Sequence, residues 1–334
     1  MPLTFFPVYA ILTITNMGCV MLPSVYGCTR YTYRKSIPNS AEDTTMIVSK
    51  IEQLRDPFIV VENGIYYAYG TGWVCYKNTS GSLAGDWECL GKVVVDPEDV
   101  QDCRWAPEVH RYGGRFYMFT TYLSSVTGHR GCVILVSDKP EGPFVAITGH
   151  AVTPTDWDCI DGTFYVDKAG QPWMVFVHEW TSTDDGCGRM AAAKLSTDLT
   201  HFVSEPVELF RADDPVWARG KVTDGCFLYP TKDGQLLMIW SNWDDAGYCV
   251  GIARSADGGP TYGSVDGKWT QDEALLYSKN MTGEYDGGHG MLFTDTDGQL
   301  YLSMHSPNNP ADGRKETPVF LPIQEENGTL VWVR

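Results

Sequence analysis

A motif of about twenty residues recurs five times along the chain and constrains the fold more than any other feature. Each copy begins with a polar or charged residue, runs through a short apolar stretch into a glycine turn, and ends in an aromatic-rich alternating stretch. The copies are RDPFIVVENGIYYAYGT, WAPEVHRYGGRFYMFTTY, IDGTFYVDKAGQPWMVFVHEW, TDGCFLYPTKDGQLLMIWSNW and GGHGMLFTDTDGQLYLSMHSP. Their starts lie about 50 to 65 residues apart. Alternating runs around such turns predict β-hairpins, and we expect the NG, GG, AG and DG pairs to close two-residue turns.

Further strand-like runs, such as HRGCVILVSD and YCVGIARS, lie between the motifs, so each unit holds about four strands. Long helical periodicity is almost absent. A repeat of this length with four strands is typical of a β-propeller. We therefore predict an all-β fold, a five-bladed β-propeller whose four-stranded antiparallel blades surround a central funnel. PVFLPI or TLVWV near the end is expected to pair with a strand from the N-terminal side and close the ring.

The first 40 residues differ from the rest, and we divide the chain into an N-terminal segment (1–40) and one propeller domain (41–334). The apolar stretch precedes the first basic residue, Arg30, whereas a secretory signal carries its positive charge before the apolar run. VYGC around Cys28 resembles a lipoprotein cleavage box. We interpret the segment as a signal or lipoprotein peptide with a linker, which favours an extracytoplasmic location. The alternatives are a mis-assigned start and a cytoplasmic protein.

Charge and composition narrow the class of ligand. The formal net charge is −17, which disfavours nucleic acid and anionic lipid, so no membrane partner is expected beyond an N-terminal anchor. Eleven Trp and eighteen Tyr either fill the core or stack on sugars. The ten Cys form no CxxC pair, and no Cys/His spacing resembles a zinc site. Most lie in strand-like runs, and we expect buried free thiols.

The leading residues of the motifs should meet at the axis, because the innermost strand of every propeller blade runs along it. These residues are Asp56, Trp105 with Glu108, Asp161, Asp224 and His289. Asp224 stands in the fourth motif where Asp161 stands in the third. Three carboxylates in one cleft suit glycoside hydrolysis, in which an acid and a base need pKa values that are pushed apart.

RDPF, WAPEV, IDGTFYVD, the fourth-blade DG-F and GGHG, in this order and at blade spacing, resemble glycoside hydrolase family 43. The likeness runs from about Leu54 to Asn309. It implies a five-bladed propeller that hydrolyses arabinofuranosides or xylosides of plant-type polysaccharides or oligosaccharides with inversion. It also implies that no organic cofactor is required.

By the same resemblance, Asp56 is the general base, Asp161 tunes and positions the acid, and Asp224 is the general acid. The family commonly has Glu at the last place. Asp is one methylene shorter, so its oxygen falls back by roughly 1.5 Å, and misplacement on that scale costs about 10²-fold in rate. Glu179 is the fallback acid, although we expect it to lie outside the axis.

Three residues have predicted roles beside the carboxylates. Trp105 is predicted to stack on the sugar, with a plug of the second blade as the alternative. Glu108 either points into the funnel as a substrate contact or braces it. His289 is predicted to contact substrate and, by the resemblance, a structural Ca²⁺ or water in the central channel.

The leading hypothesis is therefore an inverting glycosidase. One alternative is a retaining fructosidase-like propeller enzyme, since RDP also occurs in such folds. The other is a glycan-binding propeller without catalysis. This alternative stays open because Asp224 is shorter than the Glu that the family commonly has as its acid.

Overall fold

The structure is a computed structural model that describes residues 46–255, 264–282 and 284–334. Residues 43–334 form one compact unit. The predicted signal or anchor segment, with Cys19 and Cys28, lies outside the described residues. No helix among the described residues is long and apolar enough to cross a membrane.

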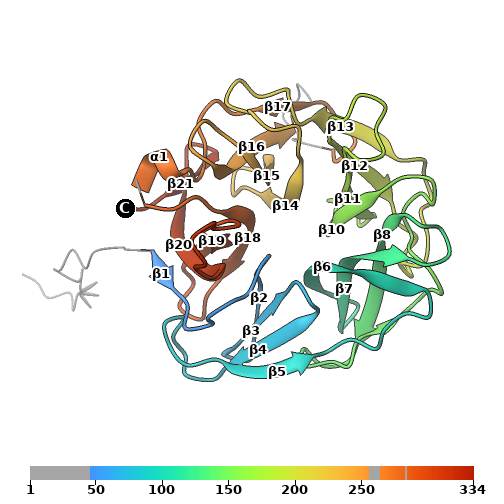
Figure 1. Cartoon of the computed structure of the whole chain (residues 1–334), viewed down its shortest axis with the longest axis horizontal. Coiled ribbons are helices and arrows are strands. Elements are labelled where there is room, and N and C mark those ends of the chain that lie inside the picture. Colours follow the sequence, from blue (N-terminus) through green and yellow to red (C-terminus); the bar gives the residue numbers. More distant parts are fainter. Residues whose placement is uncertain (1–45, 256–263, 283) are drawn as a thin grey trace, which may run out of the picture. The chain divides into compact units, whose positions relative to one another are not determined.

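Five antiparallel sheets stand around a central axis, one for each repeat (Figure 1). The first blade contains β2 (Phe58–Glu62), β3 (Ile65–Gly70), β4 (Val74–Asn78) and β5 (Glu88–Lys92). The second contains β6 (Val100–Tyr112), β7 (Arg115–Ser124), β8 (Arg130–Ser137) and β9 (Val145–Ala146). The third contains β10 (Cys159–Val166), β11 (Pro172–His178), β12 (Arg189–Lys194) and β13 (Val207–Arg211). The fourth contains β14 (Asp224–Pro230), β15 (Leu236–Trp243), β16 (Tyr248–Ser255) and β17 (Trp269–Gln271).

The fifth blade joins the two ends of the described chain. It contains β18 (Gly288–Thr294), β19 (Leu300–Ser306) and β20 (Thr317–Glu326), with β1 (Ile47–Val48) and β21 (Thr329–Trp332) both paired to β20. Ile47 pairs with Phe320 and Val48 with Val319, so the N-terminal strand closes the ring as predicted. The described residues contain a single short α-helix, α1 (Lys279–Thr282). The predicted all-β, five-bladed propeller is confirmed.

The hairpin turns follow the prediction in some blades only. Asn63-Gly64 and Gly113-Gly114 have both residues at positive φ and close two-residue turns. The prediction is wrong for the AG and DG pairs, where five-residue loops join the strands. In the third blade Gly170 alone supplies a positive φ. There Asp167 accepts the backbone N–H groups of Ala169 and Gln171 at 2.9 Å, which stabilises the longer loop.

The same left-handed backbone position occurs in, or just before, the innermost strand of every blade. In β10, Ile160 pairs with Val177 but Thr163 pairs with Val175, so one extra residue forms a β-bulge. The residues at this position have φ between 42 and 55° in all five blades, and they are Asp56, Ala106, Asp161, Gly225 and His289. Asp and His are among the side chains that tolerate the left-handed conformation best. The left-handed backbone therefore sets the direction in which the side chains of Asp56, Asp161 and His289 leave the chain.

This bulge shifts the expected correspondence between the third and fourth motifs by one residue. The sequence strings align Asp161 with Asp224, yet the left-handed residue of the fourth blade is Gly225. Asp224 pairs with Ser241, which makes it the equivalent of Ile160. The two carboxylates therefore enter the funnel from different positions of their blades.

A ring of hydrogen bonds fixes the left-handed residues. Their backbone N–H groups donate from Ala106 to Thr71 at 3.1 Å, from Asp161 to Thr121 at 2.9 Å, from His289 to Ser241 at 2.8 Å and from Asp56 to His305 at 3.3 Å. The four acceptors occupy equivalent positions in the second strand of the preceding blade or, for Thr71, directly after it. The third blade has Val177 there, and the Gly225 N–H donates instead to the Asp161 carboxylate at 3.0 Å. Because buried N–H groups need partners, this ring holds neighbouring blades in register.

The eight cysteines of the described residues are free, and six of them are buried. For these six the expectation of buried thiols is confirmed. It is wrong for Cys89, which is exposed on the outermost strand of its blade, and Cys103 is only partly buried near the beginning of β6.

Candidate active site

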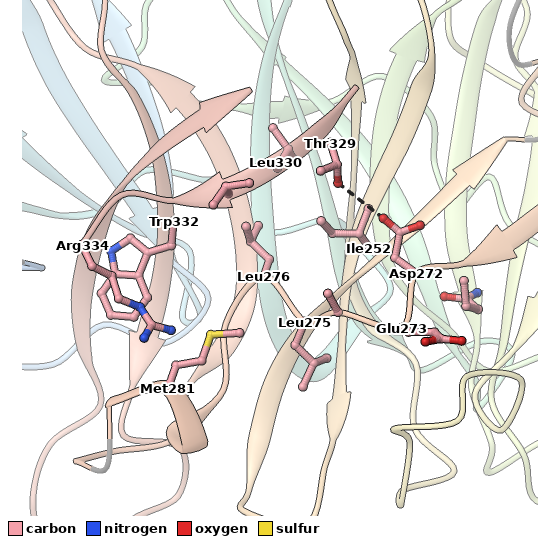
Figure 2. A pocket seen from close by; sticks show the side chains of 13 residues that line it. Ile252, Asp272, Glu273, Leu275, Leu276, Met281, Thr329, Leu330, Trp332 and Arg334 are labelled. Carbon is pink, nitrogen blue, oxygen red and sulfur yellow. Dashed lines mark hydrogen bonds between the residues drawn. The ribbon is translucent and has the colours of Figure 1, made fainter. Parts of the chain in front are cut away.

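Two cavities stand out by size. The first, of about 540 Å³, lies beside β17 and β21 in the last two blades (Figure 2). Apolar side chains such as Leu276 and Leu330 line much of it. Its Asp272 is paired with Arg254 at 2.5 Å and accepts a hydrogen bond from Thr329. Its ion pair with Arg254 occupies Asp272, whereas several carboxylates converge in the second cavity.

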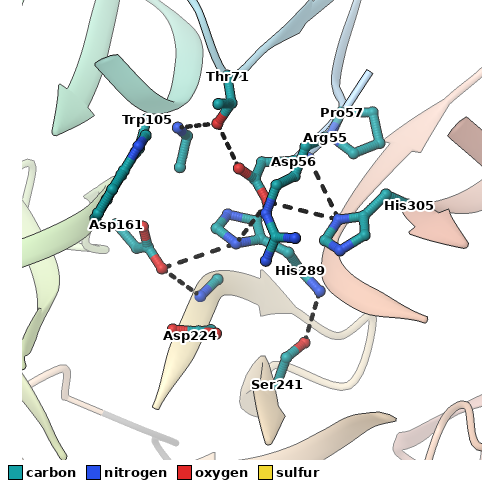
Figure 3. A network of polar contacts seen from close by, with 12 residues as sticks. Arg55, Asp56, Pro57, Thr71, Trp105, Asp161, Asp224, Ser241, His289 and His305 are labelled. Carbon is teal, nitrogen blue, oxygen red and sulfur yellow. Dashed lines mark hydrogen bonds and ion pairs between the residues drawn. The ribbon is translucent and has the colours of Figure 1, made fainter. Parts of the chain in front are cut away.

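The second cavity, of about 440 Å³, lies at the axis where the innermost strands begin. Its lining residues are Arg55, Asp56, Thr71, Trp105, Ile160, Asp161, Glu179, Trp180, Asp224, Trp243, His289, Asn309 and Glu316. They come from all five blades and from the loops that follow their strands. Figure 3 shows the polar groups of this pocket facing one another.

Five of the six predicted site residues lie together in this lining, and they are Asp56, Trp105, Asp161, Asp224 and His289. Glu108 does not belong to it. Its carboxylate is buried and lies 3.0 Å from His110 Nε2, deeper in the channel. This position agrees with the second alternative, in which Glu108 braces the funnel and does not contact substrate. Glu179, expected outside the axis, does line the pocket, because it follows directly after β11.

The aromatic residues divide between the two expected uses. Trp73 and Trp240 are fully buried between blades. Trp105, Trp180 and Trp243 line the pocket, and Trp105 is 37% exposed. An exposed indole beside carboxylates offers the flat apolar face and polar surroundings that sugar rings prefer.

Asp56 is held as a carboxylate. Burial would raise its pKa, but His289, His305 and Arg55, together with the hydrogen bond from Thr71, outweigh burial and hold the pKa below its usual range. Oδ2 accepts a hydrogen bond from the Thr71 hydroxyl at 2.5 Å. Oδ1 lies 3.3 Å from His289 Nδ1 and accepts no hydrogen bond from the described residues. Oδ1 is buried, and it also lies 3.5 Å from His305 Nδ1 and 3.6 Å from Arg55 Nε.

The two histidines near Asp56 differ in charge. Burial lowers the pKa of His305 to about 4, and the neutral ring accepts the Asp56 N–H at Nδ1. Burial would also lower the pKa of His289, but Asp56, Asp161 and further carboxylates raise it above its usual range. His289 Nδ1 lies 3.8 Å from Asp161 Oδ2. The two carboxylates therefore favour the protonated, positively charged form of His289.

Gly225 permits this arrangement, since a Cβ there would lie 2.8 Å from the His289 backbone. Its N–H in turn orients the Asp161 carboxylate. Burial raises the pKa of Asp161, with neighbouring Asp56 adding to the rise and His289 opposing it.

Asp224 has the environment of a proton donor. Burial, followed by the charge of Asp161, raises its pKa to about 7. Its Oδ2 accepts a hydrogen bond from the Tyr248 hydroxyl at 3.0 Å. Two carboxyl groups of one pocket, Asp56 and Asp224, thus have pKa values shifted in opposite directions, which is the condition for acid and base catalysis.

Sequence reasoning missed the residues that support these groups. Thr71, Thr121, Ser241 and His305 recur at one position of the second strand in their motifs, so a search for polar residues in phase with the repeat finds them. Tyr248 stands in the third strand of its blade and has no such phase signal.

The described side chains do not by themselves form a calcium cage. Calcium takes six to eight oxygen ligands, and no group of three or more His, Cys, Asp or Glu among the described residues could hold a metal ion.

Comparison with known proteins agrees with this geometry. The sequence profile described as glycosyl hydrolases family 43 matches residues 49–329. The crystal structure of an endo-arabinase from Bacteroides thetaiotaomicron is 37% identical, with a TM-score of 0.74 over 85% of this chain and 98% of that chain. A probable arabinan endo-1,5-alpha-L-arabinosidase A from Aspergillus flavus is 25% identical over 260 residues, 75% of this chain and 74% of the fungal protein. The extracellular endo-alpha-(1->5)-L-arabinanase 1 of Bacillus subtilis is 24% identical over 149 residues, 39% of this chain and 45% of the bacterial protein.

The family profile spans all five repeats, and the residues that resemble the family's motifs are those that the fold gathers at the axial pocket. The chain therefore belongs to glycosyl hydrolases family 43.

Proposed function

We propose that this glycoside hydrolase cleaves arabinofuranosyl linkages of arabinan-type glycans with inversion of configuration. The observation that supports this most is the opposed pKa shift of Asp56, lowered, and Asp224, raised to about 7. In one pocket near neutral pH, this pair supplies a carboxylate base and a protonated acid.

In the proposed reaction, the Asp56 carboxylate accepts a proton from a water molecule while that water attacks the anomeric carbon. Asp224 donates its proton to the glycosidic oxygen, and the bond between this oxygen and the anomeric carbon breaks. Asp161 keeps Asp224 protonated by its charge and, through the Gly225 N–H, fixes the backbone beside it. His289 keeps Asp56 ionised.

The choice of sugar rests on the relatives. The endo-arabinase and the arabinanases named above favour arabinofuranosyl over xylosyl linkages for this chain. The exposed indole of Trp105 suits stacking on a neutral sugar. We also propose export from the cytoplasm, by analogy with the extracellular enzyme of Bacillus subtilis.

The stereochemistry of the first product tests the mechanism. Proton NMR during hydrolysis of arabino-oligosaccharides should show the anomer of inverted configuration first. Retention at the first time point would instead support the fructosidase-like alternative.

Two variants test the roles of the carboxylates. Asp224→Ala should lose about 10²- to 10⁴-fold on arabino-oligosaccharides, but far less on a dinitrophenyl arabinofuranoside, whose leaving group needs no proton. Asp56→Asn should lose activity on both substrates. A parent protein that binds arabino-oligosaccharide but hydrolyses neither substrate would be a glycan-binding propeller.

We propose that the reaction needs no organic cofactor. A structural Ca²⁺ in the central channel, contacted by His289, stays a prediction from the family resemblance. Calcium titration of the EGTA-dialysed protein should raise its melting temperature if the prediction is correct.

A further inference from the structure

Glu179 is a buried carboxylate in the pocket that the proposed reaction does not use. Its side chain is 7% exposed and lines the same cavity as Asp161 and Trp105. It follows directly after β11, and Trp180, another lining residue, comes next in the chain. A carboxylate in such a place needs a partner, because an unpaired buried charge is costly.

Arg130 of β8 is that partner. Its Nε donates to Glu179 Oε2 at 2.5 Å, and its Nη2 lies 3.2 Å from Asp158 Oδ2. The guanidinium also lies 5.9 Å from the centre of the Trp105 ring. Burial raises the pKa of Glu179, and the ion pair with Arg130 opposes this rise. Arg130 therefore contacts both the carboxylate of Glu179 and the exposed indole of Trp105 and holds them on the same side of the pocket.

The other oxygen of Glu179 is unused. Among the described residues, no donor forms a hydrogen bond to Oε1, and this atom is not one of the sealed, unpaired polar atoms of the structure. Oε1 therefore keeps some exposure to solvent, and because Glu179 lines the pocket, this oxygen is available to accept hydrogen bonds from a ligand there. A carboxylate acceptor beside an indole face matches a sugar ring, which presents hydroxyl groups around an apolar face.

We propose that Glu179, braced by Arg130, binds hydroxyl groups of the glycan on the Trp105–Trp180 side of the pocket and selects neutral sugars over uronic acids there. A sugar carboxylate at this place would face Glu179 and would be repelled, whereas a hydroxyl group donates to it. Glu179 is thus a specificity-determining residue and not a second acid. The inference rests on the proposed function only in taking the ligand to be a glycan.

The test replaces Glu179 by Gln, which keeps the shape and removes the charge. Calorimetry in an Asp56→Asn background measures binding of a neutral arabino-oligosaccharide without turnover. We expect Kd to rise about 10- to 100-fold, as for loss of a charged hydrogen bond. In the active protein KM should rise to a similar degree, while kcat and both limbs of the pH profile stay within about threefold. The variant should also discriminate less against an oligosaccharide that carries a uronic acid.

Glu208→Gln is the matched control. Glu208 pairs with Arg189 at 2.9 Å and does not line the pocket. Its loss should leave Kd and KM unchanged. If Glu179→Gln lowers the melting temperature by more than a few degrees, Glu179→Asp keeps the charge and shortens the reach, and it should still weaken binding.

Two results would overturn the inference. One is unchanged binding in the folded Glu179 variants. The other is a large loss of kcat together with loss of the alkaline limb, which would make Glu179 the acid. Failure of the proposed function is separate: a parent without turnover whose oligosaccharide binding still depends on Glu179 would refute hydrolysis and leave this inference standing.

Discussion

At the scale of single residues, the pocket disfavours the ionised form of Asp224. Its pKa is raised to about 7 in the folded protein, chiefly by burial, while an Asp in the unfolded chain titrates near 3.8. Between these two values the folded state binds a proton that the unfolded state has released. The free energy of unfolding contributed by this group therefore falls as pH rises from about 4 to about 7 and stays low above.

Asp224→Asn should remove this pH dependence. Relative to the parent, the variant should gain stability progressively from pH 4 to pH 7 and keep a constant advantage above pH 7, on the order of a few kcal/mol. Urea unfolding of both proteins at pH 4.5, 6 and 8 measures the difference. An equal difference at all three values would show that Asp224 titrates normally in the folded protein.

The residues of the site were predictable where they stand in phase with the repeat. Asp56, Asp161 and His289 begin their motifs and carry the left-handed conformation, so the topology brings them together whatever the loops do. Glu179 has no such phase. Its place depends on where the chain turns after β11, which the pattern of apolar residues does not specify. Oxygen-to-nitrogen distances, and hence the charge on His289, also follow only from the folded geometry.

At the scale of strands, the bulge and its hydrogen-bonded partner act as one unit. The repeat predicted the hairpins, but it did not predict that Asp224 sits one position away from the equivalent of Asp161. The one-residue offset arises because Gly225 takes the left-handed conformation in the fourth blade. The Val177 position then has no hydroxyl for the Gly225 N–H, and Asp161 takes that place.

A comparison of two buried threonines distinguishes the contribution of this hydrogen bond to stability from that of side-chain packing. Thr121 and Thr163 are both fully buried, but Thr121 accepts the Asp161 N–H whereas the Thr163 hydroxyl has no partner among the described residues. Thr121→Val should cost about 1–3 kcal/mol of unfolding free energy, because it leaves a buried N–H unpaired. Thr163→Val should be neutral or stabilising. Urea unfolding of both variants checks this, and equal losses would contradict a specific role of the ring.

At the scale of the whole propeller, the sequence predicted the number of blades and the joining of the two ends of the ring. The spacing of the motifs was sufficient for the first, and apolar strands left over near the C-terminus were sufficient for the second. It did not predict that β1 would be as short as two residues, with β21 covering the rest of the same edge of β20. Strand length depends on local twist and on neighbouring loops, which leave weak marks in a sequence.

That short strand gives a direct test of how the ring is closed. Ile47 packs against the core cluster that contains Phe320, and the Ser49 N–H donates to the Pro318 carbonyl at 2.9 Å. A chain that starts at residue 50 loses these contacts and exposes part of the edge of β20. Compared with a chain that starts at residue 43, it should melt several degrees lower and aggregate faster on heating. Calorimetry of both chains decides the point: identical melting temperatures would mean that the fifth blade holds without its N-terminal strand, and that packing between blades alone closes the propeller.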